Sequence, residues 1–351
     1  MRAGDVNEVL VPILARLMRG ESLLDDEIDA AFSELLEGRV SDVQAAGFIV
    51  ALRAKGETES ELAGIVRAMR RYGEQVDVGD GAIDTCGTGG DRAGTVNVST
   101  MAALVAAGAG ARVVKHGNRA ASSRCGSADV LEALGVAIDL GPRGVARCVE
   151  EAGVGFCFAP RYHPAMRFLA PARRELGVAT TFNFLGPLAN PARVRRQAIG
   201  VSDEAMARRM LGALRELGAA HALVFHGDDG LDELTTTTTS TVHELVAGEM
   251  RTFTVDPEDF GLARSKPSAL IGGDASGNAA AVRAVVTGEH GAHRDIAVLN
   301  AGAALVVAGI APNIAEGVEL ATAAVDDGRA AHALETLVRV STEERAAEAG
   351  S

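Results

Sequence analysis

Hydrophobic residues recur every three or four positions through residues 1–72, and this spacing predicts four short helices. The second helix is expected to begin at Ser22 and to end near Gly38. The first two helices should each turn one side inward, carrying Val6, Leu10, Ile13 and Leu17 and then Leu24, Ile28, Phe32 and Leu35. The segment shows no candidate chemistry, so we expect it to pack against the rest of the chain or against a second copy.

The third and fourth helices carry sequence signals at their ends. Ser41-x-x-Gln44 and Thr58-x-x-Glu61 are capping-box patterns, in which the hydroxyl and the later side chain satisfy free backbone N–H groups of the first turn. The glycines that follow, at positions 56 and 73, predict where these two helices stop.

From Val76 the pattern changes to short apolar runs that alternate with helical segments. The expected strands are residues 82–84, 112–114, 136–140, 155–159, 197–201 and 221–226, and the helices among them include 99–109, 128–134 and 203–217. This alternation predicts an α/β domain with a mainly parallel central sheet. In such sheets ligands bind beyond the carboxyl ends of the strands.

Other segments depart from the alternation. Residues 162–190 should hold a helix that ends before Gly177 and then an irregular stretch, TTFNFLGPLANPA, because its glycine and prolines argue against a strand. Residues 242–246 and 252–255 suggest a hairpin after the threonine run 235–239. Helices are expected around 278–286 and 295–308 and after Pro312, and the charged tail beyond Ser341 is expected to fray.

Two successive loops combine glycines, hydroxyls and cations. GTGGD at 87–91 leads through NVST into a helix, and KHGNR at 115–119 leads into a hydroxyl-rich loop at 122–127 before another helix. Glycines let backbone N–H groups approach an anion, a helix N-terminus adds partial positive charge, and Lys115 and Arg119 can add full charges. The first loop has neither P-loop nor dinucleotide-binding spacing. The pattern therefore indicates a phosphate site of another kind.

Composition narrows the class of protein. The chain has 351 residues and a formal net charge of −13, which argues against a nucleic-acid partner. No apolar run reaches the roughly 18 residues of a membrane span, and the first residues show no signal-peptide pattern. Cys86, Cys125, Cys148 and Cys157 lack metal-site spacing, so we expect buried thiols in a reducing, cytoplasmic setting.

The order of motifs is more specific than any one of them. DTCGTGGD, NVST, KHGNRAASSRCGSADVLEALG and FNFLGPLANP closely resemble the anthranilate phosphoribosyltransferases of tryptophan biosynthesis, in order over nearly the whole chain. Those enzymes transfer the phosphoribosyl group of phosphoribosyl pyrophosphate (PRPP) to the amine of anthranilate. The resemblance implies a helical domain at 1–72, joined by an insertion at about 162–190, an α/β domain at 73–345, and a site in the cleft between them. It also implies a homodimer formed through the helical domain.

The resemblance assigns the PRPP and metal residues. Two Mg²⁺ ions are expected, one contacted by Ser99 and the other by the adjacent acids Asp232 and Glu233; without the resemblance, an acidic loop after a strand is more often a solvated turn. The PRPP pocket is expected to comprise Gly87, Gly90, Asp91, Thr95, Asn97, Val98, Ser99, Thr100, Lys115, His116, Gly117, Asn118, Arg119, Ala120, Ala121, Ser122, Ser123 and Ser127. Ser127 could equally be an ordinary helix cap.

Anthranilate is an anionic aromatic amine, so its site needs a cation and flat apolar walls. Arg173 matches the family arginine for the carboxylate, and its spacing from the preceding proline favours it over Arg174. Asn118 matches the asparagine that faces the amine, with Gly87 and His163 lining the approach. We assign catalysis to Lys115, Asn118 and Arg173. His116 is the tempting general base, but an aryl amine is already neutral at pH 7, so an orienting role is favoured.

The substrates imply the chemistry. Departure of pyrophosphate leaves positive charge on the ribose, which predicts a dissociative, metal-dependent displacement with inversion and no covalent enzyme intermediate. The chain departs from the family pattern at Ala179, where arginine is frequent, at Thr181, commonly aliphatic, and at Arg124-Cys125, commonly Lys-Ser. These departures affect detail rather than the assignment.

Three other readings remain open at this point. A nucleoside phosphorylase of related fold would need no metal pair, which Asp232 and Glu233 argue against. A non-catalytic nucleic-acid-binding relative would need a basic surface. A phosphoribosyltransferase for another aromatic acid would differ only at Arg173, Asn118 and a few wall residues.

Overall fold

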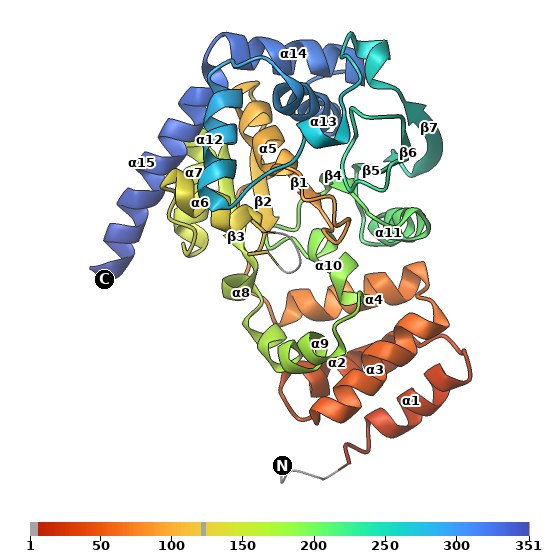
Figure 1. The fold of residues 1–351 in the computed structure, drawn as a ribbon. Coiled ribbons are helices and arrows are strands. Elements are labelled where there is room, and N and C mark those ends of the chain that lie inside the picture. The colour runs from red at the N-terminus through yellow and green to blue at the C-terminus, as the bar shows by residue number, and fades with distance from the viewer. Residues whose placement is uncertain (1–5, 121–123, 351) are drawn as a thin grey trace.

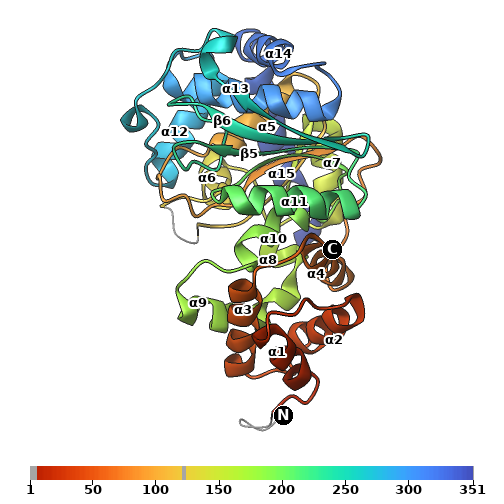
Figure 2. The same ribbon diagram turned by 90° about the vertical axis from the view of Figure 1, so that its right-hand side faces the viewer.

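The chain folds into two lobes of unequal size (Figures 1 and 2). This computed structural model describes residues 6–120 and 124–350. The smaller lobe begins with α1 (Leu10–Met18), α2 (Asp25–Leu36), α3 (Asp42–Lys55) and α4 (Glu59–Arg71). Four helices were expected in this segment, and the described part of it holds these four.

The predicted capping box is confirmed at α4, whereas at α3 only the serine half forms, because Gln44 Oε1 accepts from the Asn7 N–H. Ser41 accepts a hydrogen bond from the Gln44 N–H, and Thr58 and Glu61 form a reciprocal capping box. Two inward positions were wrong, because Val6 and Leu24 are 63% and 57% exposed. Both precede the first turn of their helices, so they lie outside the helical face that the spacing describes; Leu23 is the buried residue before α2.

The larger lobe is built on one seven-stranded sheet of order β3-β2-β1-β4-β5-β6-β7. The five strands β1 to β5 run parallel, and β6 and β7 form the expected antiparallel hairpin. The strands are β1 (Ile83–Gly87), β2 (Val113–Gly117), β3 (Val154–Phe158), β4 (Arg196–Gly200), β5 (His221–Gly227), β6 (Ser240–Val246) and β7 (Glu249–Val255). The prediction of a mainly parallel α/β domain with a separate helical bundle is confirmed.

Helices cover both faces of the sheet. Those of the larger lobe are α5 (Val98–Gly108), α6 (Ser127–Leu134), α7 (Pro142–Ala152), α11 (Glu204–Glu216), α12 (Ala275–Val286), α13 (Ala292–Ala308), α14 (Ile314–Asp326) and α15 (Arg329–Ala349). Between β3 and β4 the chain forms α8 (Ala159–Tyr162), a 3₁₀ turn (Pro164–Phe168), α9 (Ala170–Leu176) and α10 (Phe182–Leu188). Two further 3₁₀ turns, Pro257–Phe260 and Pro267–Ala269, follow β7.

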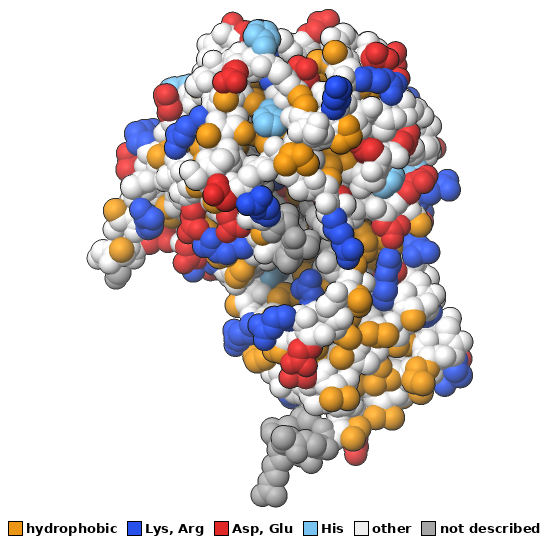
Figure 3. Space-filling model, viewed as in Figure 1, with side chains coloured by type: hydrophobic (Ala, Val, Ile, Leu, Met, Phe, Trp, Pro, Cys, Tyr) orange, Lys and Arg blue, Asp and Glu red, His pale blue; other side chains and the backbone are white. Residues whose placement is uncertain are grey.

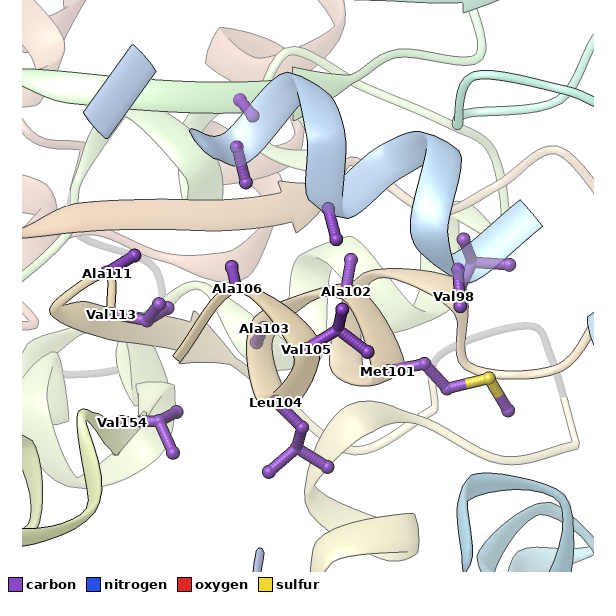
Figure 4. Packing of buried hydrophobic residues seen from close by; sticks show 14 of the residues in the cluster. Val98, Met101, Ala102, Ala103, Leu104, Val105, Ala106, Ala111, Val113 and Val154 are labelled. Carbon is purple, nitrogen blue, oxygen red and sulfur yellow. The ribbon is translucent and has the colours of Figure 1, made fainter. Parts of the chain in front are cut away.

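Strand side chains alternate between two cores. In β5, Leu223 and Phe225 join the core formed with α5, α12, α13, α14 and α15, while Ala222 and Val224 join the core that contains the helical lobe, α10 and α11. This is the period-2 alternation of a strand buried on both faces. On the first side α5 is rich in alanine, and Figure 4 shows the short side chains of Ala102 and Ala106 directed toward a neighbouring helix. Small side chains of this kind allow the close packing of α5 against α13.

Three local predictions were wrong. The apolar residues of 136–140 are buried but form no strand, because polar groups of this run bond elsewhere: the Ala137 N–H donates to Ser341 Oγ, and the Leu140 carbonyl accepts from the Tyr162 hydroxyl. The stretch predicted to be irregular contains α10, which holds Pro187 inside it. The tail continues as helix to Ala349, and Glu344 pairs with Arg147 of α7.

Two expectations about class can be compared with the structure. Within the described residues, no helix is long and apolar enough to cross a membrane. All four cysteines are buried thiols.

Candidate active site

The predicted loops meet along one edge of the sheet. β1, β2, β4 and β5 all end in glycine, at Gly87, Gly117, Gly200 and Gly227, and the loops that follow these strands carry most of the predicted site residues. Parallel strands place their carboxyl ends together, which explains how segments more than a hundred residues apart reach one place. Two of the glycines are needed for close approach: an added Cβ would lie 2.3 Å from Asp232 Oδ2 at Gly87, and 1.7 Å from the Asp232 carbonyl oxygen at Gly200.

The two acids after β5 are buried against the first loop. The Gly89 N–H donates to Asp232 Oδ2 at 2.6 Å, and the Ser99 N–H donates to Glu233 Oε1 at 3.1 Å. The acidic pair is therefore held by backbone donors from the glycine loop and from the start of α5. A solvated turn, the alternative left open by the sequence, is excluded by this burial.

Lys115 is the cation nearest to this cluster. Its ammonium donates to the Thr85 carbonyl at 2.6 Å and to Ser99 Oγ at 3.0 Å, and the side chain is buried. Burial raises the pKa of Glu233 to about 8, although Lys115 opposes the shift. Burial, together with the neighbouring Glu233 and Asp91 carboxylates, raises the pKa of Asp232 well above its usual range. The pair thus has an unmet demand for positive charge.

The donor set suits a hard cation. Two carboxylates and the Ser99 hydroxyl are oxygen ligands, the kind that Mg²⁺ prefers, and Mg²⁺ normally takes its remaining ligands from phosphates and water. Among the described residues, no group of three or more His, Cys, Asp or Glu side chains could hold a metal ion alone. The residues present therefore fit a cation that arrives with an anionic ligand.

The start of α5 offers buried polar atoms with no partner. Asn97 precedes the helix, and its amide Nδ2 donates to the Cys125 carbonyl at 3.1 Å. Its Oδ1 and the Thr100 hydroxyl are buried and make no hydrogen bond. Unsatisfied buried groups are costly, so these two atoms indicate a polar ligand at the helix N-terminus. Val98 and Ser99 complete this first turn.

The second loop is organised by Asp129. Its carboxylate accepts from the Ala120 and Gly126 N–H groups at 3.0 and 2.9 Å, and it also pairs with Arg119 at 2.9 Å. Because Arg119 pairs with Glu132 as well, its charge is already neutralised. The Ser127 hydroxyl donates to the Asn118 carbonyl at 3.3 Å and so ties the start of α6 to the loop. The predicted residues Ala121, Ser122 and Ser123 lie outside the described residues.

Between the glycine loop and α5, the remaining predicted residues are more open. Gly90 has a φ of +88°, which L side chains rarely adopt. Asp91 Oδ1 accepts from the Ala93 N–H at 3.1 Å, and Thr95 forms an isolated bridge with Ile271. The structure thus places all of the described first-loop residues on one short path from β1 to α5.

Two buried histidines lie where the lobes join. The ring centroids of His116 and His163 are 5.1 Å apart. His116 Nδ1 bonds the Gly186 carbonyl at 2.9 Å and His163 Nε2 bonds the Ala189 carbonyl at 3.0 Å, which leaves His116 Nε2 and His163 Nδ1 without partners. Burial lowers the pKa of His116 to about 3, so its imidazole is neutral at pH 7.

Asp84 and Asn190 are site-supporting residues that the sequence did not reveal. Asn190 Nδ2 donates to Asp84 Oδ2 at 2.7 Å and to the Val114 carbonyl at 2.8 Å, and the other Asp84 oxygen accepts from the His116 N–H at 3.2 Å. Burial raises the pKa of Asp84 to about 6, against the effect of Lys115. The two residues are 106 positions apart, so only a shared fold brings them together. Their one sequence signal is that each lies inside a quoted motif.

Arg173, the predicted anthranilate-binding cation, lies on α9. Its guanidinium lies 5.5 Å from the centroid of the Phe182 ring at the start of α10, and burial lowers its pKa. Among the described residues, no carboxylate lies within ion-pairing distance of it. Arg174, the alternative, is exposed. A partly buried cation beside an aromatic wall is a suitable place for an aromatic carboxylate.

Comparison with known proteins identifies the family of the chain. The a/b domain of the glycosyl transferase family matches residues 79–331, and the helical bundle domain of that family matches residues 11–73. The anthranilate phosphoribosyltransferase of Rubrobacter xylanophilus is 53% identical over 93% of this chain and 96% of its own length. That of Roseiflexus castenholzii is 51% identical over 94% of this chain and 97% of its own length.

Solved structures give the same result. The crystal structure of anthranilate phosphoribosyltransferase from Thermus thermophilus has a TM-score of 0.89 at 44% identity, covering 94% of this chain and 99% of that one. The enzyme from Saccharomyces cerevisiae, in complex with PRPP and Mg, has a TM-score of 0.88 at 26% identity, covering 96% and 99%. With its two lobes, its strand-end acidic pair and these near full-length relatives, the chain belongs to the anthranilate phosphoribosyltransferase family.

Proposed function

We infer that this protein transfers the 5-phosphoribosyl group of PRPP to the amine of anthranilate, giving N-(5-phosphoribosyl)anthranilate and pyrophosphate in tryptophan biosynthesis. The observation that carries this conclusion is the pairing of two unlike subsites. One is a buried, oxygen-rich cluster at the strand ends, around Lys115 and Glu233, and the other is a cation on an aromatic wall, around Arg173. PRPP is a polyphosphate that binds Mg²⁺ and suits the first subsite, whereas anthranilate is an aromatic carboxylate and suits the second.

We propose that PRPP binds along the strand ends. The support is the unpartnered Asn97 and Thr100 oxygens at the start of α5 and the buried Lys115 ammonium beneath the same turn. The full set is the one expected from sequence: Gly87, Gly90, Asp91, Thr95, Asn97 to Thr100, Lys115 to Ser123, and Ser127. Arg119 would contribute through the loop it orders, because Asp129 and Glu132 already neutralise its charge.

We propose that two Mg²⁺ ions accompany PRPP, held by Ser99 and by Asp232 and Glu233. The raised pKa values of both acids support this, because a bound cation would remove the cost of burying them ionised. Bound Mg²⁺ would supply positive charge to the departing pyrophosphate. Lys115 adds a fixed charge to the same region, since its ammonium lies 3.0 Å from Ser99 Oγ.

Anthranilate is proposed to bind with its carboxylate on Arg173 and its amine toward Asn118, with Gly87 and His163 lining the approach. The unpartnered nitrogens of His163 and His116 support a polar ligand on this side. His116 is neutral at pH 7, so it can orient a group by hydrogen bonding, and the already neutral aryl amine needs no base before it attacks. Transfer is proposed to be dissociative, with inversion and no covalent enzyme intermediate.

Two alternatives differ in what they require. A phosphoribosyltransferase for another aromatic acid would keep the strand-end cluster and change only the partners of Arg173. A nucleoside phosphorylase would need no oxygen cluster with unmet positive charge, so the burial of Asp232 and Glu233 counts against it.

The function is tested by following the intrinsic fluorescence of anthranilate with the purified protein. We expect a decay that requires protein, PRPP and Mg²⁺ together and stops when EDTA is added. PRPP binding without any decay would point to another aromatic acceptor, whereas consumption of a nucleoside with phosphate would replace the assignment by a phosphorylase.

The division into domains is proposed as 1–72 with the insertion at about 162–190, and 73–345. Its support is that residues of α9 and α10, such as Ala172 and Phe182, share a hydrophobic core with the first four helices. The buried thiols are consistent with the proposed cytoplasmic location.

We propose that the helical lobe forms a homodimer. Apolar side chains are exposed on α1 and α3, which pack together, and Figure 3 shows hydrophobic side chains gathered on this lobe. They include Val11 at 48%, Met18 at 80%, Val43 at 82% and Val50 at 44% exposure. Contiguous apolar surface of this kind usually marks an interface.

Charged substitutions on this face should break the dimer. The double variant Met18→Glu and Val43→Glu is expected to sediment as a monomer at concentrations where the parent protein sediments as a dimer, because a two-fold interface would bury each new charge twice. Leu320→Glu, an exposed leucine on α14, serves as the control and should remain dimeric. A monomeric parent, or a variant that stays dimeric, would reject this face as the interface.

A further inference from the structure

The acidic pair lies between two buried leucines whose backbone groups are hydrogen-bonded. Leu231 precedes Asp232 and Leu234 follows Glu233, and both leucines are buried. The N–H groups of both leucines donate to side-chain oxygens, and the Leu231 carbonyl accepts from the Gly227 N–H at 2.9 Å. The loop from Asp228 to Thr239, which follows β5, is therefore fixed on each side of the pair.

Asn300 of α13 forms hydrogen bonds with both the N–H and the carbonyl of Leu234. Its Oδ1 accepts from the Leu234 N–H at 2.9 Å, and its Nδ2 donates to the Leu234 carbonyl at 2.9 Å and to the Ile296 carbonyl at 2.8 Å. The side chain is 3% exposed. Two hydrogen bonds from a buried amide tie the residue after Glu233 to the centre of a long helix, and the third fixes the amide to that helix.

Asp229 fixes the chain on the other side of the pair, at Leu231. Its Oδ1 accepts from the Leu231 N–H at 3.2 Å, and its Oδ2 accepts from the Thr235 hydroxyl at 2.8 Å and from the Thr237 hydroxyl. One carboxylate thus links the residue before Asp232 to the threonine run after Glu233. The Thr239 hydroxyl donates to Asp228 in the same way. The threonine run 235–239, which is of low complexity in the sequence, thus supplies hydroxyls that hold the loop together.

The hydrogen bonds on each side of the pair oppose a cost of burial. Two adjacent acidic side chains are costly to remove from water whether ionised or protonated, so an unrestrained loop would relax until they reached water. Asp232 and Glu233 instead keep contact with Gly89 and Ser99 on the far side of the site. The hydrogen bonds of Asp229 to Leu231 and of Asn300 to Leu234 favour this position.

We propose that Asn300 and Thr235 are positioning residues, which hold the Asp232–Glu233 dipeptide in its cation-binding place by bonding Leu234 and Asp229. This rests on the proposed function, because the pair matters only if Mg²⁺ and PRPP bind there. Neither side chain touches a substrate in this account. Residues that hydrogen-bond to metal-binding groups and orient them typically contribute about 10- to 100-fold to metal affinity.

The test is calorimetric titration of PRPP into the full chain at several Mg²⁺ concentrations. Asn300→Leu, which is nearly isosteric, should weaken Mg²⁺-dependent PRPP binding about 10- to 100-fold. Anthranilate binding, measured by quenching of its fluorescence, should change less than about twofold. If Asn300 had a purely structural role, the substitution would lower the affinity for both PRPP and anthranilate and would also lower the stability of the protein.

Thr235 provides a pair of variants that remains informative if Asn300→Leu does not fold. Thr235→Val keeps the volume and loses the hydroxyl, while Thr235→Ser keeps the hydroxyl and loses a methyl group. We expect Ser to bind PRPP nearly as the parent does and Val to bind several-fold more weakly. Packing alone would give the opposite order. Thr336→Val, a buried threonine on α15, is the matched control and should bind as the parent does.

The outcomes separate the two levels of the account. If the parent protein binds no PRPP at any Mg²⁺ concentration, the proposed function fails and the positioning role fails with it. If the parent binds PRPP and both Asn300→Leu and Thr235→Val bind equally well, only the positioning role is overturned.

Discussion

The two sides of the proposed active site are built in opposite ways. On the strand-end side, Lys115, Asp232 and Glu233 are buried, and each bonds a backbone group of another segment of the chain. On the helical side, Arg173 lies on the short helix α9, with its guanidinium 5.5 Å from the centroid of the Phe182 ring. The first side is dense in hydrogen bonds, and the second is a single cation against an apolar wall.

This difference shows what each side has to do. Charge develops on the leaving pyrophosphate during transfer, and fixed groups stabilise such charge without reorganising at that moment. The anthranilate carboxylate keeps the same charge throughout, so the helical side needs to bind and aim it rather than follow a change. We therefore expect the strand-end side to govern turnover and the helical side to govern the anthranilate requirement.

The largest effect should come from Lys115. Lys115→Met keeps the length of the side chain but removes its charge, leaving Asp84 and Glu233 without their nearest cation. Steady-state assays should show kcat lowered about 100- to 1,000-fold, the scale for losing one fixed transition-state donor. A variant with unchanged kcat would remove the strand-end side from the chemistry.

An intermediate effect should come from Arg173. Arg173→Ala should raise KM for anthranilate about 10- to 100-fold, the loss of one charge-assisted contact, while KM for PRPP stays close to that of the parent. Arg174→Ala is the matched control, since Arg174 is exposed beside it, and should change neither constant. If Arg174→Ala had the larger effect, the carboxylate contact would belong to that residue instead.

The smallest effect should be on stability, at Asp84. Its pKa is raised from 3.8 to about 6 by burial, so the folded state holds this proton more tightly than the unfolded chain. The contribution of Asp84 to stability is therefore present below about pH 4 and is lost as the pH rises to about 6.

Denaturant titrations at several pH values can isolate this contribution. As the pH rises from about 4 to about 6, the free energy of unfolding should fall less in Asp84→Asn than in the parent, because the variant has no carboxyl at this position to ionise. Above pH 7 the free energy of unfolding should change with pH equally in the two proteins. Equal slopes at every pH would mean that Asp84 titrates alike in both states.

Local signals in the sequence predicted much of the fold. Ser41 and Thr58 cap helices as expected, because a cap depends on residues three positions apart. The run 136–140 looked like a strand because it is apolar, yet its polar groups are satisfied by Ser341 and Tyr162, which are remote in sequence. The stretch around Pro187 became helical because tertiary contacts outweighed its helix-breaking residues: Gln197 Nε2 donates to the Pro187 carbonyl at 2.7 Å.

The site shows the same division. Lys115, Ser99 and the acidic pair lie in recognisable motifs, so the family resemblance located them. Asn190 and Asn300 lie 106 and 66 positions from the residues they hold, and nothing nearby in the sequence marks either partner. Supporting residues of this kind become visible only when strand ends and helix α13 are seen together.

The most direct test of the account is a crossed binding experiment. PRPP with Mg²⁺, and separately anthranilate, would be titrated calorimetrically into Lys115→Met and into Arg173→Ala. We predict that Lys115→Met loses affinity mainly for PRPP and Arg173→Ala mainly for anthranilate. If both variants lost both ligands to the same extent, the two sides would not be separate subsites and the account would be contradicted.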